Sequence, residues 1–312
     1  MAFRFDRVPV AEATVVSNGG KLGEIFEDHG RFEIVLPAPY RTKVTATLLS
    51  PGTGKLNIDP PDPDPTKTRR AIRLAIDKLG LRGRLQALDV EVRINRSFEH
   101  GSGLGQSSND MRCAVLAVLK ALGVDISEHD LNQILASIEP TDPDVGCSLA
   151  LWDHLRGLEL SPRYRLPSCC VVGAIPIGST LDTSTIVRPT YSRHWEWLFR
   201  VTRNELLTRI LPNPNRVELA RVATLSARIN QDFFAKPAFW PLWQSLPPDA
   251  GIVVAHSGTV IAGIGGPDEL LKIFDWITAT LRSLGHAYEI IAYTIDGNSQ
   301  SMTIGDTPFR RI

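Results

Sequence analysis

The residues best suited to chemistry gather in one glycine-rich turn. Gly101, Gly103 and Gly105 fall within a five-residue stretch. Small polar side chains follow them at Gln106, Ser107, Ser108, Asn109 and Asp110. Because glycine has no side chain, such a turn lets a ligand approach the bare backbone. At the start of a helix, unpaired N–H groups and the positive end of the helix dipole point at the same spot, so the turn is predicted to bind an anion such as phosphate.

Patterned segments on both sides hold this turn in place. Apolar and charged residues alternate over 88–94, which predicts a half-buried strand. From Met111 to Leu122 apolar residues recur with helical spacing, and Gly123 follows where a left-handed helix cap is expected. The turn matches neither G-x-x-x-x-G-K-[ST] nor G-x-G-x-x-G, the two familiar nucleotide-binding patterns. On these residues alone, a phosphate site and a turn that serves only packing both fit.

A second group of candidate residues follows the next predicted helix. Ser127 is a good helix cap, and apolar residues with helical spacing come after it. Pro140 ends this helix, because the residue before a proline avoids the helical conformation. Glu139 is thereby turned out of the helical register, and two further acids follow at Asp142 and Asp153. A metal or proton-transfer site and an ordinary solvent-facing helix end both remain open here.

The N-terminal part of the chain offers one cation in a glycine-rich setting. Lys21 follows a glycine pair and precedes Gly23 and Glu24, and strand-like runs over 32–36 and 42–48 come next. Glycines on both sides would let a phosphate-bearing ligand approach the lysine. A phosphate-facing cation and a solvated surface lysine are the two interpretations.

Composition limits the class of protein. The chain has 312 residues, enough for one large or two ordinary domains, and its 34 basic and 34 acidic residues balance. We therefore expect neither a nucleic-acid partner nor a membrane partner, and the balance favours an enzyme that acts on small molecules. The first residues carry charges and no signal-peptide pattern, and the four cysteines form no C-x-x-C motif, so a cytoplasmic location is expected.

The glycine turn resembles the second signature of the GHMP kinases, a superfamily of small-molecule kinases that includes galactokinase, homoserine kinase, mevalonate kinase and phosphomevalonate kinase. That signature reads G-L-G-S-S-A-A, and this chain has G-L-G-Q-S-S-N over 103–109, departing from it at Gln106. The resemblance implies an ATP site whose Mg²⁺ is held by Ser107 and Glu139. The residues that it assigns to ATP are Gly101, Ser102, Gly103, Leu104, Gly105, Gln106, Ser107 and Ser108.

Within this superfamily the sequence is most similar to the L-threonine kinases of cobalamin side-chain synthesis and propanediol utilisation. The most specific segments are E-P-T-D over 139–142 and A-H-S-G-T-V over 255–260. The similarity implies transfer of phosphate from ATP to the side-chain hydroxyl of L-threonine or a related hydroxy amino acid. A GHMP kinase for another alcohol, such as homoserine or a sugar, and a non-catalytic nucleotide-binding or metabolite-binding relative remain as alternatives.

The resemblance also assigns catalytic and substrate-binding roles. Asp153 is narrowly preferred over Asp142 as the carboxylate that accepts or orients the hydroxyl proton, although Asp142 stands closer to the metal-binding glutamate. Lys21 is the accompanying phosphate-facing cation. The residues predicted to contact the acceptor are Glu24, Asp182, Thr183, His256, Ser257 and Gly258.

The expected fold is α+β with two domains. An N-terminal ATP-binding domain of the ribosomal protein S5 domain 2-like type is predicted for 1–165, and a ferredoxin-like domain for 166–312. Short apolar runs over 251–255 and 259–264 predict a hairpin in the second domain, with His256, Ser257 and Gly258 in its turn. An oligomer, most simply a dimer, is expected.

Overall fold

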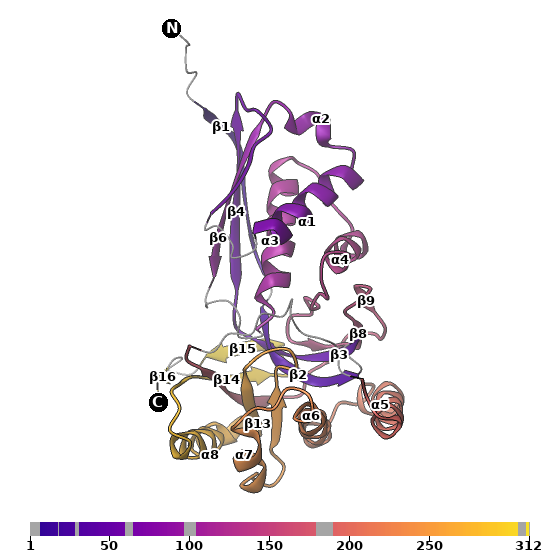
Figure 1. The fold of residues 1–312 in the computed structure, drawn as a ribbon, viewed down its shortest axis with the longest axis vertical. Helices are drawn as coiled ribbons and strands as arrows, with labels where there is room; N and C mark the ends of the chain where they lie inside the picture. Colours follow the sequence, from indigo (N-terminus) through magenta and orange to yellow (C-terminus); the bar gives the residue numbers. More distant parts are fainter. Residues whose placement is uncertain are drawn as a thin grey trace.

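The structure is a computed structural model that describes residues 7–17, 19–28, 31–59, 65–96, 104–178, 190–304 and 310–311. Two sheets, one upright and one lying across its lower end, organise the molecule (Figure 1). Mixed helices and strands around two sheets confirm the predicted α+β class. No helix in these ranges has the length and apolar character needed to cross a bilayer.

The upright sheet has four strands in the order β1-β4-β6-β5, all antiparallel except the parallel pair β5 and β6. The bounds are Val8–Val16 for β1, Thr42–Ser50 for β4, Leu56–Asp59 for β5 and Asp89–Arg96 for β6. Its helices are α1 (Pro65–Lys78), α2 (Arg82–Leu85), α3 (Gln106–Ala121) and α4 (Glu128–Ala136). Apolar side chains of the strands and of α1, α3 and α4 form one core between these layers.

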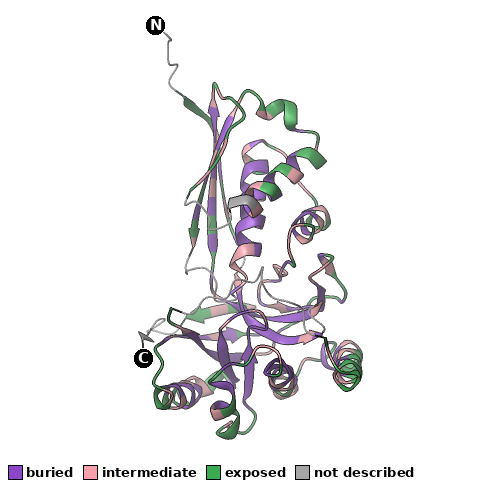
Figure 2. Ribbon diagram, viewed as in Figure 1, coloured by how far each residue is buried: buried purple, intermediate pink, exposed green. Residues whose placement is uncertain are grey.

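Helix α3 is the central helix of this half, and most of its side chains are buried (Figure 2). The predicted apolar spacing from Met111 onward is confirmed, because these side chains lie in the core beneath β4 and α1. Gly123 has φ of +67° and so supplies the expected left-handed cap. Ser127 caps α4 as predicted, because its hydroxyl accepts a hydrogen bond from the backbone N–H of Asp130 at 3.0 Å.

The lower sheet has ten strands. Nine of them follow the order β15-β14-β11-β13-β12-β2-β3-β8-β9, and β16 pairs with β14. The bounds are Gly20–Asp28 for β2, Phe32–Ala38 for β3, Trp152–Asp153 for β8, Leu158–Glu159 for β9, Cys169–Pro176 for β11, Gly251–Val254 for β12, Ile261–Gly265 for β13, Tyr288–Asp296 for β14, Ser301–Ile304 for β15 and Arg310–Arg311 for β16. A separate pair joins β7 (Ser148–Leu149) to β10 (Tyr164–Arg165).

Four strands and two helices of the lower half have ferredoxin-like topology. The chain runs β11, α6 (Arg216–Asn230), β12, β13, α8 (Leu270–Ser283), β14, and the antiparallel strands lie in the order β14-β11-β13-β12. This topology confirms the ferredoxin-like fold predicted for the second domain and the predicted hairpin of β12 and β13. The remaining helical segments are α5 (Arg193–Glu205), η2 (Leu206–Ile210), α7 (Phe239–Gln244) and η3 (Pro267–Glu269).

Strands β2 and β3 extend this sheet although they precede it in the chain. Strand β12 pairs with β2 at Val254 and Glu24, so the lower sheet takes strands from both sides of the predicted boundary at 165/166. That boundary stays a prediction. Gly23 makes the pairing possible: its φ is +121°, and a Cβ there would lie 2.6 Å from the carbonyl oxygen of Val254. Strand β2 is thereby part of the lower sheet and also contacts the residues just before α3, through the backbone N–H of Lys21.

Candidate functional site

The buried ion pair of Lys21 and Asp142 is the centre of the candidate site. Lys21 lies near the start of β2, and its backbone N–H donates to the carbonyl of Leu104 at 3.3 Å, next to the first turn of α3. Its Nζ lies 2.5 Å from Oδ1 of Asp142, while only 7% of the residue is exposed. Asp142 follows α4 in a segment that returns to α3. The tertiary structure therefore joins a lysine and an aspartate that are far apart in sequence.

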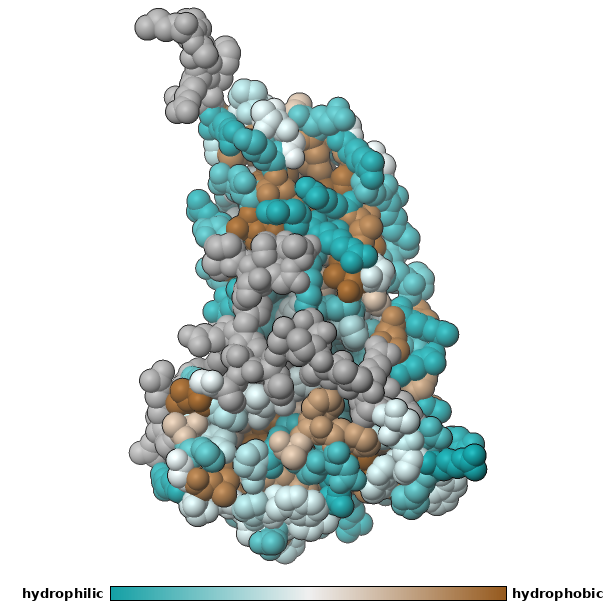
Figure 3. Space-filling view, in the orientation of Figure 1, coloured by the Kyte–Doolittle hydropathy of each residue, from teal (hydrophilic) through white to brown (hydrophobic). Residues whose placement is uncertain are grey.

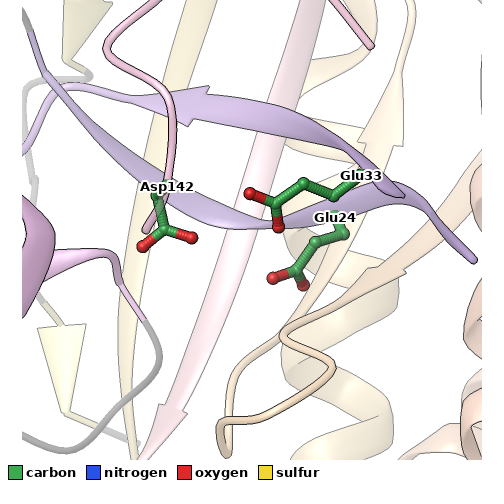
Figure 4. Close-up of side chains that lie close together, drawn as sticks. All are labelled: Glu24, Glu33 and Asp142. Carbon is green, nitrogen blue, oxygen red and sulfur yellow. The ribbon is translucent and has the colours of Figure 1, made fainter. Parts of the chain in front are cut away.

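Two further carboxylates, those of Glu24 and Glu33, lie beside the same ammonium group. Figure 4 shows them together with Asp142. Nζ of Lys21 lies 2.5 Å from Oε1 of Glu24 on β2 and 3.7 Å from Oε2 of Glu33 on β3. Burial alone would lower the pKa of Lys21, but the carboxylates of Asp142, Glu24 and Glu33 together raise it well above its ordinary value. Burial raises the pKa of Glu33, against the opposing effect of Lys21 and of His154, whose Nδ1 lies 3.4 Å from Oε2 of Glu33.

These three carboxylates lie close enough together to hold a metal ion, since one oxygen from each falls within 4.8 Å of the others. Lys21 already supplies a cation there, because its Nζ lies within 2.5 to 3.7 Å of all three groups. A divalent ion at the same position would add a second positive charge at short range to a buried ammonium, which is unfavourable. The cluster is therefore an ion-paired lysine site rather than a metal site.

A separate pair of oxygen ligands stands at the start of α3. The hydroxyl of Ser107 donates to Oε1 of Glu139, and the other carboxylate oxygen lies 2.7 Å from Nζ of Lys67 on α1. The side chains of Lys67 and Glu139 keep 25% and 15% of their surfaces exposed. A hydroxyl and a carboxylate at one point beside a helix N-terminus form the kind of hard oxygen set that Mg²⁺ accepts. The predicted juxtaposition of Ser107 and Glu139 is thus present.

Ser108 and Gly105 connect the two groups. The Ser108 hydroxyl accepts from the backbone N–H of Asp142 at 3.0 Å and lies 3.2 Å from its Oδ2. Gly105 precedes α3 with φ of +71°, and a Cβ there would lie 3.1 Å from Oδ2 of Asp142 and 3.3 Å from Cγ of Lys21. Glycine is required for both reasons, because other residues disfavour this conformation and would crowd the ion pair.

Asp153 is not part of the Lys21 cluster in the described contacts. It lies on β8, almost completely buried, and Oδ2 is 3.0 Å from both Nε and Nη2 of Arg31. The ring of the next residue, His154, reaches Glu33, and the backbone carbonyl of His154 accepts from the backbone N–H of Thr141 at 3.0 Å. Asp142, the second candidate from the sequence, therefore contacts Lys21 in the structure, whereas Asp153 contacts Arg31.

A third polar group surrounds His256 in the turn between β12 and β13. Its backbone N–H donates to Oε2 of Glu24 at 2.8 Å, and its ring pairs through Nδ1 with Glu27. Nε2 lies 3.2 Å from the hydroxyl of Ser226 on α6. Burial alone would raise the pKa of Glu27, but the neighbouring His256 lowers it to about 2. Glu24 therefore bridges the Lys21 cluster and the His256 group.

Lys236 provides a second buried ammonium near these acids. Its Nζ donates to Oδ1 of Asn230 at 2.9 Å and to the carbonyl of Phe234 at 3.2 Å. Burial lowers the pKa of Lys236 to about 8, although Glu24 and Glu27 act in the opposite direction. The amide of Asn230 also donates to the carbonyl of His256 at 3.2 Å, so the lysine and the histidine belong to one network.

The structure brings together most of the residues predicted from sequence. Leu104, Gly105 and the side chains of Ser107 and Ser108 lie at the start of α3, where Gln106 is the first residue of the helix. Ser257 and Gly258 lie in the turn with His256, and the N–H of Gly258 donates to Ala255 at 3.3 Å. The predicted residues outside the described ranges are Gly101, Ser102, Gly103, Asp182 and Thr183.

Sequence reasoning missed several members of the site. They are Glu27, Glu33, Lys67, Ser226 and Lys236. One signal was available, for Glu33. It is the one charged residue in the otherwise apolar strand β3. A charge in such a run is costly unless it is paired, so it marks a position with a partner.

Comparison with known proteins gives one family match and two curated relatives. Residues 67–149 match the family model described as GHMP kinases N terminal domain. L-threonine kinase of Salmonella typhimurium is 28% identical over 182 residues, covering 55% of this chain and 59% of that protein. L-threonine kinase of Citrobacter freundii is 29% identical over 188 residues, covering 55% and 61%. The matched region thus spans less than two thirds of either relative.

Solved structures share the fold over nearly the whole chain. Homoserine kinase from Cytophaga hutchinsonii has a TM-score of 0.65 at 14% identity and covers 97% of this chain and 100% of its own. Phosphomevalonate kinase of Streptococcus pneumoniae has a TM-score of 0.66 at 15% identity, with 94% and 99% covered. Mevalonate kinase of L. major, solved with R-mevalonate, has a TM-score of 0.64 at 14% identity, again with 94% and 99% covered. The chain therefore shares the fold of these small-molecule kinases, and its residues 67–149 match the GHMP kinase N-terminal domain.

Proposed function

We propose that this chain is an ATP-dependent kinase that phosphorylates the side-chain hydroxyl of L-threonine or of a closely related hydroxy amino acid. The observation that carries the proposal is the buried Lys21–Asp142 pair beside the first turn of α3. It places a carboxylate and a cation beside a helix start that suits phosphate. The two curated relatives named L-threonine kinase support this choice of acceptor.

The phosphate end of the site is the start of α3. The first N–H groups of a helix lack partners within the helix and favour an anion. Gly105 keeps the approach open, and Ser107 and Ser108 add hydroxyls on the first turn. ATP would be held by residues 104–108 together with the preceding glycines, as the family resemblance implies.

Ser107 and Glu139 would hold the Mg²⁺ that accompanies ATP. Their oxygen atoms are already in contact, and oxygen ligands of this kind suit a hard cation. When bound, Mg²⁺ would neutralise charge on the phosphates. The neighbouring Lys67 holds the second oxygen of Glu139 and orients that carboxylate toward the helix start.

Asp142 is the proposed residue that orients the acceptor hydroxyl and takes its proton. One carboxylate oxygen contacts Lys21 and the other lies near the hydroxyl of Ser108, so the group is fixed in position. Lys21 adds positive charge where the phosphoryl group would pass. Asp153 is the weaker candidate, because both of its strong contacts go to the guanidinium of Arg31.

An amino-acid acceptor needs one acid for its ammonium group and one cation for its carboxylate. Glu24 and Glu27 supply buried negative charge next to His256, and Lys236 supplies a buried positive charge in the same network. A sugar or a simple alcohol would have no use for such a pair of opposite charges. This network supports a hydroxy amino acid over the other alcohols.

A phosphorylation assay with ATP and a panel of acceptors tests the proposal. The panel contains L-threonine, L-serine, L-homoserine, a hexose and mevalonate, and the wild-type protein is compared with Asp142→Asn, Lys21→Met and Ser107→Ala. We expect turnover with a hydroxy amino acid and a loss of about 10²- to 10⁴-fold in kcat for Asp142→Asn. Asp125→Asn is the matched control, because Asp125 is an exposed aspartate in the loop before α4.

The assay also separates the alternatives. Turnover only with L-homoserine, a hexose or mevalonate would replace the proposed acceptor but keep the kinase. Binding of ATP with no phosphoryl transfer to any member of the panel would contradict the kinase. If Asp153→Asn lost activity while Asp142→Asn kept it, the assigned roles of the two aspartates would be wrong. Circular dichroism of each variant checks that the fold is retained.

A further inference from the structure

A second candidate binding site lies at the other end of β2, beside α5. It is a surface pocket of about 440 Å³. The residues that line it are Asp28, Arg31, Phe32, Arg193, Glu196, Trp197, Arg200 and Arg203. In Figure 1, α5 lies at the outer edge of the lower half, and the same region of Figure 3 is strongly hydrophilic. The pocket contains none of the residues assigned to the kinase site.

Helix α5 contributes five of the lining residues from one face. Arg193, Glu196, Trp197, Arg200 and Arg203 follow the i, i+3, i+4, i+7, i+10 spacing of neighbours on a helix surface. Thr202 on the opposite side of the helix and Phe199 on its flank are buried. Packing of the buried residues of α5 against the protein therefore holds its arginine-bearing face toward the pocket.

The pocket has more positive than negative charge. Four arginines and two acids line it, and Asp153, which lies behind Arg31, offsets one further charge. In the described part of the chain, Arg193 and Arg200 form no ion pair, and both are exposed. Glu196 lies between them on the helix and partly screens them. These two guanidinium groups are available for an anion.

The other two arginines are held in fixed positions. Arg31 pairs with the buried Asp153, and Arg203 pairs with the buried Asp28. Both guanidinium groups also lie over the ring of Phe32, at 4.7 Å and 4.5 Å from its centroid. Ion pairing and ring stacking reduce the conformational freedom that these side chains would lose on binding a ligand.

We infer that this pocket binds a small polyanion through its arginines. Guanidinium groups match the geometry of phosphate and carboxylate oxygens and bind them in a bidentate manner. Trp197, half exposed at 51%, offers a flat apolar wall for the rest of such a ligand. Asp28 lies seven residues from Lys21 along β2, about 23 Å in an extended strand, so the anion would not occupy the proposed ATP site.

Isothermal titration calorimetry with two probes tests the inference. Inorganic pyrophosphate and citrate are titrated separately into the wild-type protein, which distinguishes phosphate from carboxylate as the source of the oxygens. The test variant is Arg193→Gln with Arg200→Gln. The matched control is Arg221→Gln with Arg282→Gln, which removes two exposed arginines from α6 and α8. Binding of a probe near α3 would be the same in the wild type and in both variants, so it does not affect the differences between them.

We expect at least one probe to bind about tenfold or more weakly to the α5 variant and unchanged to the control. Glu196→Gln should strengthen binding, because it removes the acid between the two arginines. Equal weakening in the test and control variants would show that only the net charge matters and would overturn the inference. Failure of both probes to bind the wild-type protein, or equal binding to the wild type and the α5 variant, would overturn it as well.

Discussion

Lys21 and Lys236 are two buried lysines with opposite electrostatic environments. Their exposed fractions are 7% and 6%, so burial itself does not distinguish them. Lys21 contacts two carboxylates at 2.5 Å, and its pKa is raised well above the ordinary value. Lys236 contacts an amide oxygen and a carbonyl, and burial lowers its pKa to about 8. The pKa of a buried amine thus depends more on the groups in direct contact with it than on how deeply it is buried.

The comparison also separates two roles within one site. A lysine with a raised pKa stays protonated throughout the physiological range and serves as a fixed positive charge. A lysine with a pKa near 8 is mostly protonated at neutral pH but loses its proton in mildly alkaline solution, and a negatively charged group beside it would hold the proton more firmly. Lys21 therefore suits permanent charge neutralisation at the phosphate end, and Lys236 suits an acceptor carboxylate that would complete its ion pairing.

Removal of Lys21 should have the largest effect on stability. Lys21→Met leaves Asp142, Glu24 and Glu33 close together without their shared cation, and we expect a loss of about 3–5 kcal/mol in the free energy of unfolding. Lys236→Met removes hydrogen bonds to neutral oxygens and should cost less than about 2 kcal/mol. Urea unfolding at neutral pH measures both. Equal losses would contradict the distinction between the two lysines.

The pH dependence of stability should reveal Lys236. Its pKa is about 8 in the folded protein against 10.5 ordinarily, so between these pH values the unfolded chain binds the proton and the folded chain does not. The free energy of unfolding should therefore rise with pH across this window, by up to about 3 kcal/mol from this residue. Lys21 has the opposite sign, because its raised pKa gives stability that is present below pH 10.5 and lost above its folded-state pKa.

Urea titrations between pH 7 and pH 10 isolate this effect as the difference between wild type and Lys236→Met. As pH rises, the free energy of unfolding of the wild type should increase steadily relative to that of Lys236→Met. A difference that stays flat over the whole range would show that Lys236 keeps an ordinary pKa in the folded protein.

The ion pair of Lys67 and Glu139 should give the smallest effect. The two groups are 2.7 Å apart but partly exposed, so solvent screens the interaction. We expect Lys67→Gln to lower the free energy of unfolding by less than about 1 kcal/mol, and added salt should shrink the difference further. A loss as large as that of Lys21→Met would mean that this pair is far better shielded from water than its exposure indicates.

Much of the fold could be predicted because its helices and strands follow from patterns of neighbouring residues. The alternation over 88–94, the helical spacing after Met111 and the cap at Ser127 all depend on neighbours in the sequence, and the structure confirms each of them. The participation of β2 and β3 in the lower sheet could not be predicted. It depends on one strand pairing between Glu24 and Val254, and the glycine that permits this close approach has no distinctive pattern of its own.

The candidate site shows the same limit. Ser107 and Glu139 could be paired from sequence because a known signature relates them. The contact of Lys21 with Asp142 could not, because strand β2 and the segment after α4 meet only in the folded chain. For the same reason the choice between Asp153 and Asp142 stays a prediction, although the structure places Asp142 beside Lys21 and Asp153 beside Arg31.

The sequence by itself determined the helix and strand periods, the glycine turn and the types of side chain available, because these properties need only neighbouring residues. The tertiary structure alone decided which charges meet: three carboxylates around Lys21, none in contact with Lys236 among the described residues, and a cluster of arginines beside Phe32. The physical reason is that electrostatic energy in a protein depends on distance and burial, and both are set only when remote segments pack together.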